Sequence, residues 1–262
     1  MSTQSLLQAK DDFRSARQKA TMQQLLANIS GRSMDLLDYE EIRGQLHAHN
    51  QSDRGLQEIP VDAIVGSVGR SRDFTRTFLP KSDSTMERWS RVKTHVDAAG
   101  MDPVSVYQIG DAYFVLDGNH RVSIARQNKI PTIPAYVTEV QTRVPLTKLD
   151  DPHAVICKAR YADFLAETGL DALRPQADVK MTQCGYYTLL LEHIAVHRYF
   201  MGLDEQRDVP YDEAVAHWYD HVYRPIVDLA HAYGLPENFP GYTDTDLYVL
   251  VALNRGEIEQ DL

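Results

Sequence analysis

The chain has 262 residues, of which 43 % are hydrophobic, so it can bury a substantial core in one or two domains. It contains no run of 18 apolar residues, and its first residues lack the basic-then-apolar pattern of a secretion signal. We therefore expect neither a membrane span nor export, and we expect a cytoplasmic protein. The only two cysteines, Cys157 and Cys184, are too few for a disulfide framework and predict free, buried thiols.

The net charge of −10 is unevenly distributed along the chain. Basic and acidic side chains number 7 and 7 in residues 1–57, 12 and 10 in 58–149, and 8 and 20 in 150–262. Together with the patterns below, this predicts an N-terminal helical segment with a linker, an α/β domain, and an acidic, tyrosine-rich helical region, in that order. The acidic region would repel the phosphates of DNA, so any nucleic acid should contact the middle segment.

The N-terminal segment has helical spacing of its apolar residues. Two amphipathic helices are predicted, over 6–26 and from Asp35 to about Leu46. Residues 47–55 are polar and end in glycine, which is typical of a linker. Residues 59–65 are apolar and are predicted to enter the core as a strand or turn.

A loop rich in glycine, hydroxyl and arginine residues follows, over 66–76. Backbone N–H groups at glycines and arginine side chains both bind phosphates, so the loop predicts a phosphate contact. The alternative is a surface loop with solvated arginines. The loop residues that we expect to bind a nucleotide are Gly66, Ser67, Gly69, Arg70 and Arg72.

The next helix is predicted from a capping box at Ser84–Glu87 to Gly100, with Trp89 on the face that packs on the sheet. Residues 70–93 hold seven basic side chains against three acidic ones, which makes this stretch the candidate DNA-binding face.

The central feature is a hairpin followed by a glycine turn and a helix. Residues 107–114 predict two short strands joined at Gly110-Asp111, and Asp117-Gly118-Asn119-His120-Arg121 then opens a helix. The first turn of a helix offers unpaired N–H groups to an anion, and His120 and Arg121 can add charged contacts. The alternative is an ordinary helix start capped by Asp117 or Asn119.

Residues 130–140 return as a strand after this helix. A strand, a helix and a strand predict a right-handed crossover, with the turn at a carboxyl end of the sheet.

These residues resemble the core of the ParB/sulfiredoxin superfamily. The resemblance rests on Asp117–Arg121, with 59–64 before it and 133–137 after it, and covers about a third of the chain. It implies a small mixed-sheet domain whose turn holds the phosphates of ATP or CTP. Sulfiredoxin has its catalytic cysteine where this chain has Asn119, so sulfiredoxin chemistry is excluded. ParB proteins follow this core with a helix-turn-helix domain, which the acidic helical region replaces here.

The first functional hypothesis is a nucleotide-binding protein acting as a Mg²⁺-dependent NTPase or phosphotransferase. Asp117 would hold the metal, while His120 and the arginines neutralise the phosphates. In the free-serine kinases that the turn resembles, an acidic residue after the entry strand is the base, and Asp73 is the nearest candidate. The alternatives are a DNA-associated regulator that binds through 70–93, and a non-catalytic scaffold. The N-terminal helices could also pack on a second copy of the chain.

Helices are predicted in the acidic region over 151–168, 185–202, 211–233 with a kink or break at Pro225, and 244–256. Two pairs of histidines, His193/His197 and His217/His221, have the i, i+4 spacing of metal ligands. The favoured interpretation is that they are hydrogen-bonded within a tyrosine-rich core, with a metal site as the alternative.

Overall fold

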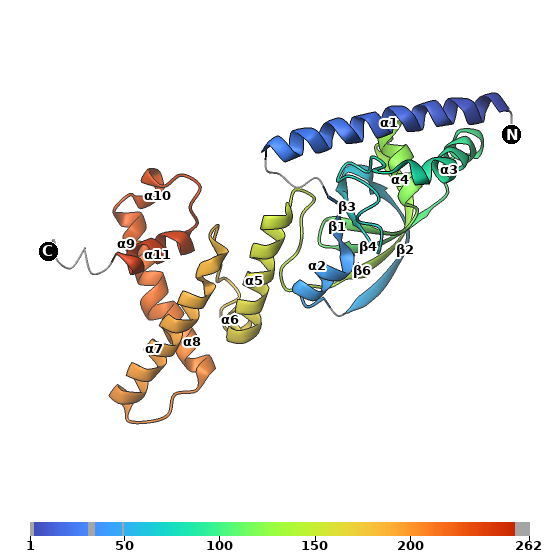
Figure 1. Ribbon diagram of the computed structural model, residues 1–262. Helices are drawn as coiled ribbons and strands as arrows, with labels where there is room; N and C mark the ends of the chain where they lie inside the picture. Colours follow the sequence, from blue (N-terminus) through green and yellow to red (C-terminus); the bar gives the residue numbers. More distant parts are fainter. Residues whose placement is uncertain (1–2, 31–34, 49, 255–262) are drawn as a thin grey trace. The chain divides into compact units, whose positions relative to one another are not determined.

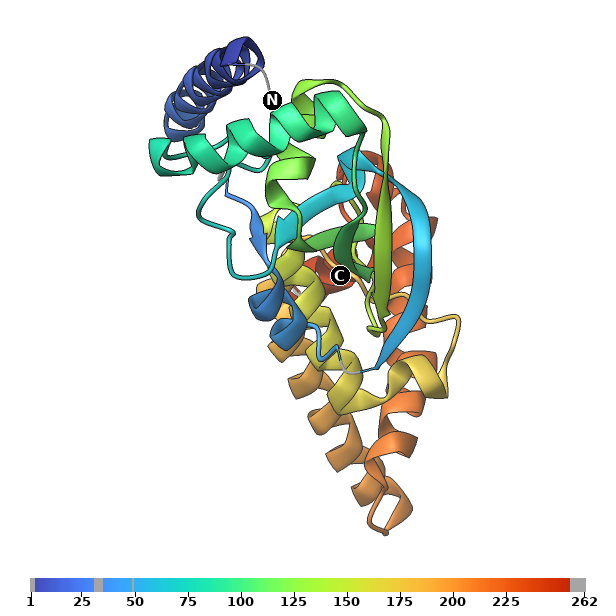
Figure 2. The same ribbon diagram turned by 90° about the vertical axis from the view of Figure 1, so that its right-hand side faces the viewer.

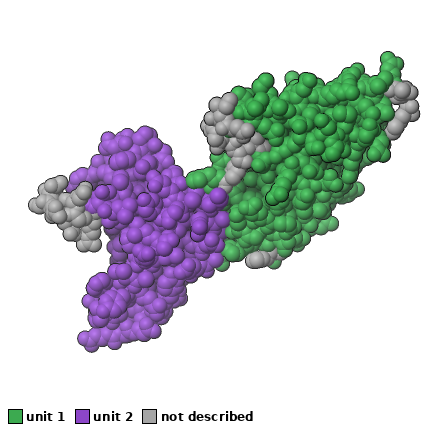
Figure 3. All heavy atoms as spheres, in the orientation of Figure 1, with its two compact units in different colours: residues 1–155 green, residues 156–262 purple. Residues whose placement is uncertain are grey.

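The computed structural model describes residues 3–30, 35–48 and 50–254, and it has the mixed α/β class expected from the sequence (Figure 1). The chain divides into two compact units, residues 1–155 and 156–262, coloured separately in Figure 3. The first unit contains the sheet, and the second consists of helices. Within the described residues, no helix is long and apolar enough to cross a membrane.

The sheet of the first unit has six strands in the order β1-β3-β5-β4-β6-β2. Strands β1, β3 and β5 are parallel, β4 is antiparallel to β5 and parallel to β6, and β2 is antiparallel to β6. The carboxyl ends of β1, β3 and β5 therefore meet at one edge. The strands are Leu37–Asp38 (β1), Gln51–Pro60 (β2), Ile64–Ser67 (β3), Val104–Ile109 (β4), Ala112–Asp117 (β5) and Thr132–Val140 (β6).

The predicted hairpin and turn-and-helix unit are confirmed as β4, β5 and helix α4, Asn119–Gln127. The predicted parallel crossover from β5 to the following strand is wrong. Because β6 pairs with the far side of β4 and runs parallel to it, β5 and β6 are antiparallel. The turn after β5 still lies at a carboxyl edge, the one that β5 shares with β1 and β3.

Two N-terminal predictions need correction. The second helix, α2, covers only Tyr39–Gln45, because Leu37 and Asp38 pair with β3 as a strand and the Asp38 carboxylate caps the helix by accepting from the N–H groups of Glu40 and Glu41. The predicted linker already contains the start of β2 at Gln51. This strand is polar because it is an edge strand whose residues are mostly exposed.

Helix α3, Met86–Ala99, was expected to pack on the sheet. It packs mainly on the helices α1, Thr3–Ser30, and α4. It lies beside α1 in Figure 2, and Phe13 of α1 meets the buried Trp89 edge to face at 5.7 Å. Trp89 also donates its indole N–H to the Ser123 hydroxyl of α4 at 3.0 Å. The predicted capping box is not formed, because Ser82 caps a 3₁₀ turn at Asp83–Thr85 that precedes the helix. Gly100 ends α3 as predicted.

The helices predicted in the acidic region are confirmed within the described residues; positions 255–256 of the last one lie outside them. The helix predicted over 211–233 is not broken at Pro225: its backbone stays helical from Tyr211 to Ala232, with a π-helical stretch at Tyr219–Tyr223 directly before α9, in whose first turn Pro225 lies. The helices are Pro152–Thr168 (α5), Leu170–Leu173 (α6), Tyr187–Glu205 (α7), Tyr211–Trp218 (α8), Arg224–Ala232 (α9), Leu235–Asn238 (α10) and Asp244–Leu253 (α11).

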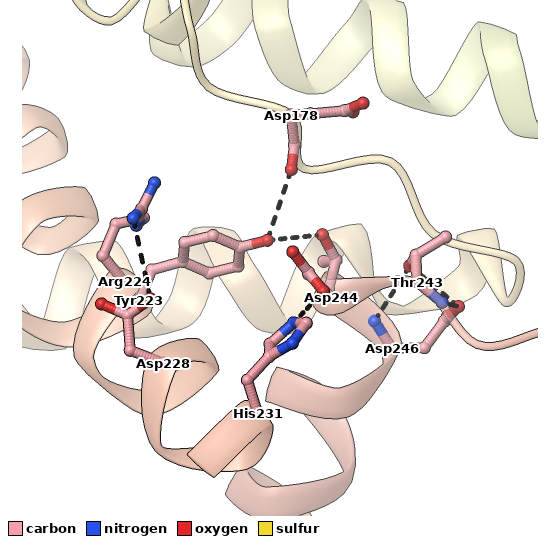
Figure 4. A network of polar contacts seen from close by, with 9 residues as sticks. Asp178, Tyr223, Arg224, Asp228, His231, Thr243, Asp244 and Asp246 are labelled. Carbon is pink, nitrogen blue, oxygen red and sulfur yellow. Dashed lines mark hydrogen bonds and ion pairs between the residues drawn. The ribbon is translucent and has the colours of Figure 1, made fainter. Parts of the chain in front are cut away.

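Tyrosine hydroxyls hold this helical unit together through buried hydrogen bonds, as expected (Figure 4). The Tyr223 hydroxyl bonds the Thr245 hydroxyl at 2.8 Å and the Asp178 carbonyl at 3.4 Å, which ties the π-helical stretch to α11. Thr243 and Asp246 cap α11 reciprocally. The prediction of free thiols is wrong, because Cys157 and Cys184 form a disulfide that closes a stretch of 27 residues.

Candidate anion-binding site at the amino end of α4

Helix α4 begins without a side-chain cap. Gly118 is its N-cap, with a left-handed φ of +111°, and neither Asp117 nor Asn119 caps it, so that alternative is wrong. A Cβ on residue 118 would lie 2.5 Å from Cγ1 of Val104. Glycine is therefore required both by the backbone angle and by the neighbouring strand. The first N–H groups of α4 remain available to a ligand.

A pocket of about 200 Å³ opens at this helix end. It unites the predicted turn with Arg70 of the predicted phosphate loop. It also includes Arg88 and Val92 of α3, and Leu116 of β5. None of the three was predicted as a ligand of the phosphates, and Arg88 was predicted only as part of the basic stretch 70–93. The lining residues are Arg70, Arg88, Val92, Leu116, Asp117, Gly118, Asn119, His120 and Arg121.

His120 is the most unusual residue of this pocket. Its side chain is 6 % exposed and stands edge-on to the Phe74 ring at 5.4 Å. Among the described residues, neither ring nitrogen has a hydrogen-bond partner, and the same holds for the buried side-chain oxygen of Asn119. Burial lowers the pKa of His120 to about 4, with smaller contributions from Arg88 and Arg70. The imidazole is therefore neutral at pH 7 and has unused hydrogen-bonding capacity.

Arg121 and Asp117 are paired with each other. The Arg121 guanidinium lies 2.5 Å from the Asp117 carboxylate and also donates to the carbonyls of Pro103 and Asp102. These contacts fix Arg121 at the pocket wall and neutralise the carboxylate predicted to hold Mg²⁺. Within the described part of the chain, no group of three carboxylate, imidazole or thiolate ligands gathers around Asp117.

Asp73, the candidate base, lies next to the pocket instead of lining it. It forms an ion pair with Arg70 at 3.3 Å, and its N–H donates to the Arg70 carbonyl at 3.1 Å. The loop that carries it is anchored by Phe74 and Phe78, which are fully buried. Arg72 is exposed and does not line the pocket.

The three other residues of the predicted phosphate loop also lie outside this lining. Gly66 belongs to β3, where a Cβ would lie 2.4 Å from the Phe114 ring. Ser67 is buried and donates its hydroxyl to the Val115 carbonyl at 3.3 Å. Gly69 has a φ of +69° with open space around it. Gly66 and Ser67 therefore have structural roles in the sheet.

The basic stretch 70–93 offers fewer surface cations than its composition suggested. Arg76 donates to the Asp150 carbonyl, Lys81 pairs with Asp35, and the largely buried Lys93 pairs with Asp97 at 2.6 Å. The exposed arginines of the stretch are Arg70, Arg72, Arg88 and Arg91.

The four histidines of the two i, i+4 pairs are hydrogen-bonded, in agreement with the favoured interpretation. His193 bonds the Tyr248 hydroxyl and His197 bonds His217, each at 2.8 Å, and His221 donates to the His217 carbonyl at 3.1 Å. Among the described residues, these imidazoles are not part of any group of three potential metal ligands.

Comparison with known proteins gives no further guidance. No family model, no curated protein and no solved structure matches the chain.

Proposed function

We propose that the chain binds the phosphates of a nucleotide in the pocket at the amino end of α4. The observation that carries this proposal is the buried, neutral His120 with two unpartnered ring nitrogens, beside an uncapped helix end and three arginines. A buried polar group without a partner costs about 1–3 kcal/mol, which a bound ligand could recover. Helix N–H groups and arginines favour an anion as that ligand.

The size of the pocket limits what it can enclose. Pockets that enclose drug-sized ligands have volumes of roughly 300–1,000 Å³, whereas this one has about 200 Å³. A phosphate or diphosphate group fits that space, and the sugar and base would lie outside. The pocket therefore supports phosphate recognition without favouring ATP over CTP.

Catalysis would extend this function. A Mg²⁺ ion would arrive on the nucleotide phosphates, and Asp117 is the carboxylate of the pocket that could bind it after releasing Arg121. Asp73 would need to exchange its pairing with Arg70 before acting as a base. Hydrolysis or transfer of the phosphoryl group would thus require both pairs to rearrange when the nucleotide binds.

Nucleotide titration by calorimetry tests the proposal, with ATP, CTP, GTP and pyrophosphate each measured with and without Mg²⁺. Arg88→Gln removes a pocket cation, and Arg91→Gln removes an exposed cation of the same helix that does not line the pocket. We expect Arg88→Gln to weaken binding by about tenfold, which corresponds to about 1.4 kcal/mol, and Arg91→Gln to have little effect. If none of these ligands shows saturable binding, the proposal is refuted.

The same variants separate this function from DNA binding. A DNA-associated regulator would use Arg70, Arg72, Arg88 and Arg91 together, because all four are exposed. Both variants would then weaken binding to duplex DNA equally, and the affinity would fall steeply with salt concentration. That outcome would favour the DNA-associated function over the nucleotide pocket.

A further inference from the structure

The helical unit contains a second site, unrelated to the phosphate pocket. A groove of about 360 Å³ lies among α7, α11 and the stretch from α8 to α9. Helix α7 contributes four residues spaced by three and four positions, so they share one face. The residues used in the argument are His193, Val196, His197 and Phe200 of α7, Trp218 of α8 and Tyr248 of α11.

A chain of hydrogen bonds links Trp218, Tyr248 and His193. The Trp218 indole can only donate, and it donates to the Tyr248 hydroxyl at 3.4 Å. The hydroxyl and Nδ1 of His193 share a hydrogen bond at 2.8 Å, in which either atom can be the donor. When the hydroxyl donates, Nδ1 is the bare nitrogen and Nε2 carries the proton of the neutral ring. Among the described residues, Nε2 has no hydrogen-bond partner, so in this tautomer His193 offers the groove an N–H donor.

The rest of the groove is apolar and open to solvent. Val196 and Phe200 are 55 % and 56 % exposed, although they stand beside fully buried Trp218. Tyr199 and Leu203 extend the exposed apolar surface along α7. An exposed apolar surface that leads into a concave groove is typical of a binding site.

Charge selects among apolar ligands. Residues 156–262 hold 18 acidic and 8 basic side chains, so this unit repels anions. Burial lowers the pKa of His193 and of His197, so neither imidazole supplies a positive charge at neutral pH. A cation would lose its hydration without gaining a partner, because the described lining holds no carboxylate. An uncharged ligand avoids both costs and can still accept a hydrogen bond.

We propose that this groove binds a small, uncharged, mainly apolar molecule whose carbonyl oxygen accepts the Nε2 proton of His193. The volume, about 360 Å³, lies at the small end of ligand pockets and suits a compact ring system. The apolar walls supply the affinity, and the His193 donor selects ligands that carry an acceptor.

Nile red, a neutral apolar dye with a ring carbonyl, is a suitable probe for the full chain. Its fluorescence reports binding, and two competitors of similar shape test the donor: 2-acetylnaphthalene, which has a carbonyl, and 2-isopropenylnaphthalene, which has none. We expect the ketone to compete about three- to tenfold more strongly with the wild-type protein. His193→Phe should remove that preference while the dye still binds.

Two substitutions on α7 distinguish binding in the groove from non-specific binding to exposed apolar side chains. Phe200 lines the groove, whereas Tyr199 is an exposed aromatic neighbour that does not. Phe200→Ser should weaken dye binding by about tenfold or more and Tyr199→Ser by less than about twofold. Equal losses in the two variants, or an unchanged ketone preference in His193→Phe, would overturn the proposal.

Sedimentation of the same samples covers the remaining occupant, a second copy of the chain. If the wild-type protein is a dimer that Phe200→Ser dissociates, and the wild type binds no dye, the groove is an interface between copies and the small-molecule proposal is wrong.

Discussion

His120 shows how one side chain can link the stability of the first unit to its candidate anion-binding site. In the unfolded chain a histidine has a pKa near 6.5, whereas burial lowers the pKa of His120 to about 4 in the folded state. Between these pH values the unfolded chain binds more protons than the folded one. The unfolding free energy therefore falls as the pH falls from about 6.5 to 4.

We predict that His120→Phe removes this dependence on pH. The shift corresponds to at most about 3 kcal/mol that the wild-type protein loses between pH 7 and pH 4 and the variant does not. Urea unfolding at both pH values measures it, and comparing the two proteins cancels the titration of His193 and His197, which both retain. Equal losses of unfolding free energy in the two proteins would show that folding does not lower the pKa of His120.

Gly118 supports a second prediction at the same scale. An alanine at this position must adopt a φ of +111° and place its Cβ 2.5 Å from Val104. Left-handed backbone costs about 1–2 kcal/mol, and overpacking typically adds about 1–3 kcal/mol.

Gly69→Ala is the matched control, because Gly69 also has a positive φ but open space around it. We expect Gly118→Ala to lower the unfolding free energy by at least about 1 kcal/mol more than Gly69→Ala does, measured by urea unfolding at pH 7. Similar losses would mean that the contact with Val104 relaxes without cost.

At the scale of elements, the local patterns identified most helices and the hairpin, and they failed where pairing partners decide the structure. Leu37 and Asp38 continue a helical pattern, but they form β1 because β3 offers them a parallel partner. The polar run from Gln51 has no strand pattern, because alternation requires a buried face and this edge strand is mostly exposed. Both outcomes are decided by strands that lie far away in the sequence.

The candidate site was predictable for similar reasons only in part. The glycine turn could be predicted because Gly118 lies directly between a strand pattern and a helix pattern. Arg88 lies about 30 residues away on α3, and it was recognisable only as one member of a basic stretch. Gly66 and Ser67 looked like ligands of a phosphate, but packing against Phe114 and Val115 explains them. Long-range packing thus separates binding residues from structural ones of the same type.

The disulfide between α5 and the turn before α7 gives a prediction for the helical unit. Closing a stretch of 27 residues restricts the unfolded chain, which stabilises the folded state by about 3–4 kcal/mol in the chain-entropy treatment. Dithiothreitol should therefore lower the urea midpoint of the wild-type protein. The double variant Cys157→Ser/Cys184→Ser should unfold at this lower midpoint with or without reductant. A midpoint that reductant leaves unchanged while free thiols appear would contradict the prediction.

For the whole molecule, the two units have separate hydrophobic clusters and separate candidate sites. The sheet unit buries its core on both faces of the sheet, and the helical unit has its own cluster of Met201, Val209 and Ala214. The pocket at the amino end of α4 lies entirely in the first unit and the apolar groove entirely in the second. A ligand of one unit should then stabilise mainly that unit.

Hydrogen exchange followed by mass spectrometry measures this separation directly. We predict that ATP with Mg²⁺ slows amide exchange in 86–92 and 116–127, which carry the pocket residues of α3 and α4, and leaves the rates in 193–203 unchanged. Nile red should do the reverse, because its groove is lined by α7 and α11. Arg88→Gln serves as the control, since at an ATP concentration near the wild-type Kd it should strongly reduce the effect of ATP and preserve that of the dye. If ATP slows exchange in both units to the same extent, the units are energetically coupled, and the two sites must then be treated as parts of one binding equilibrium.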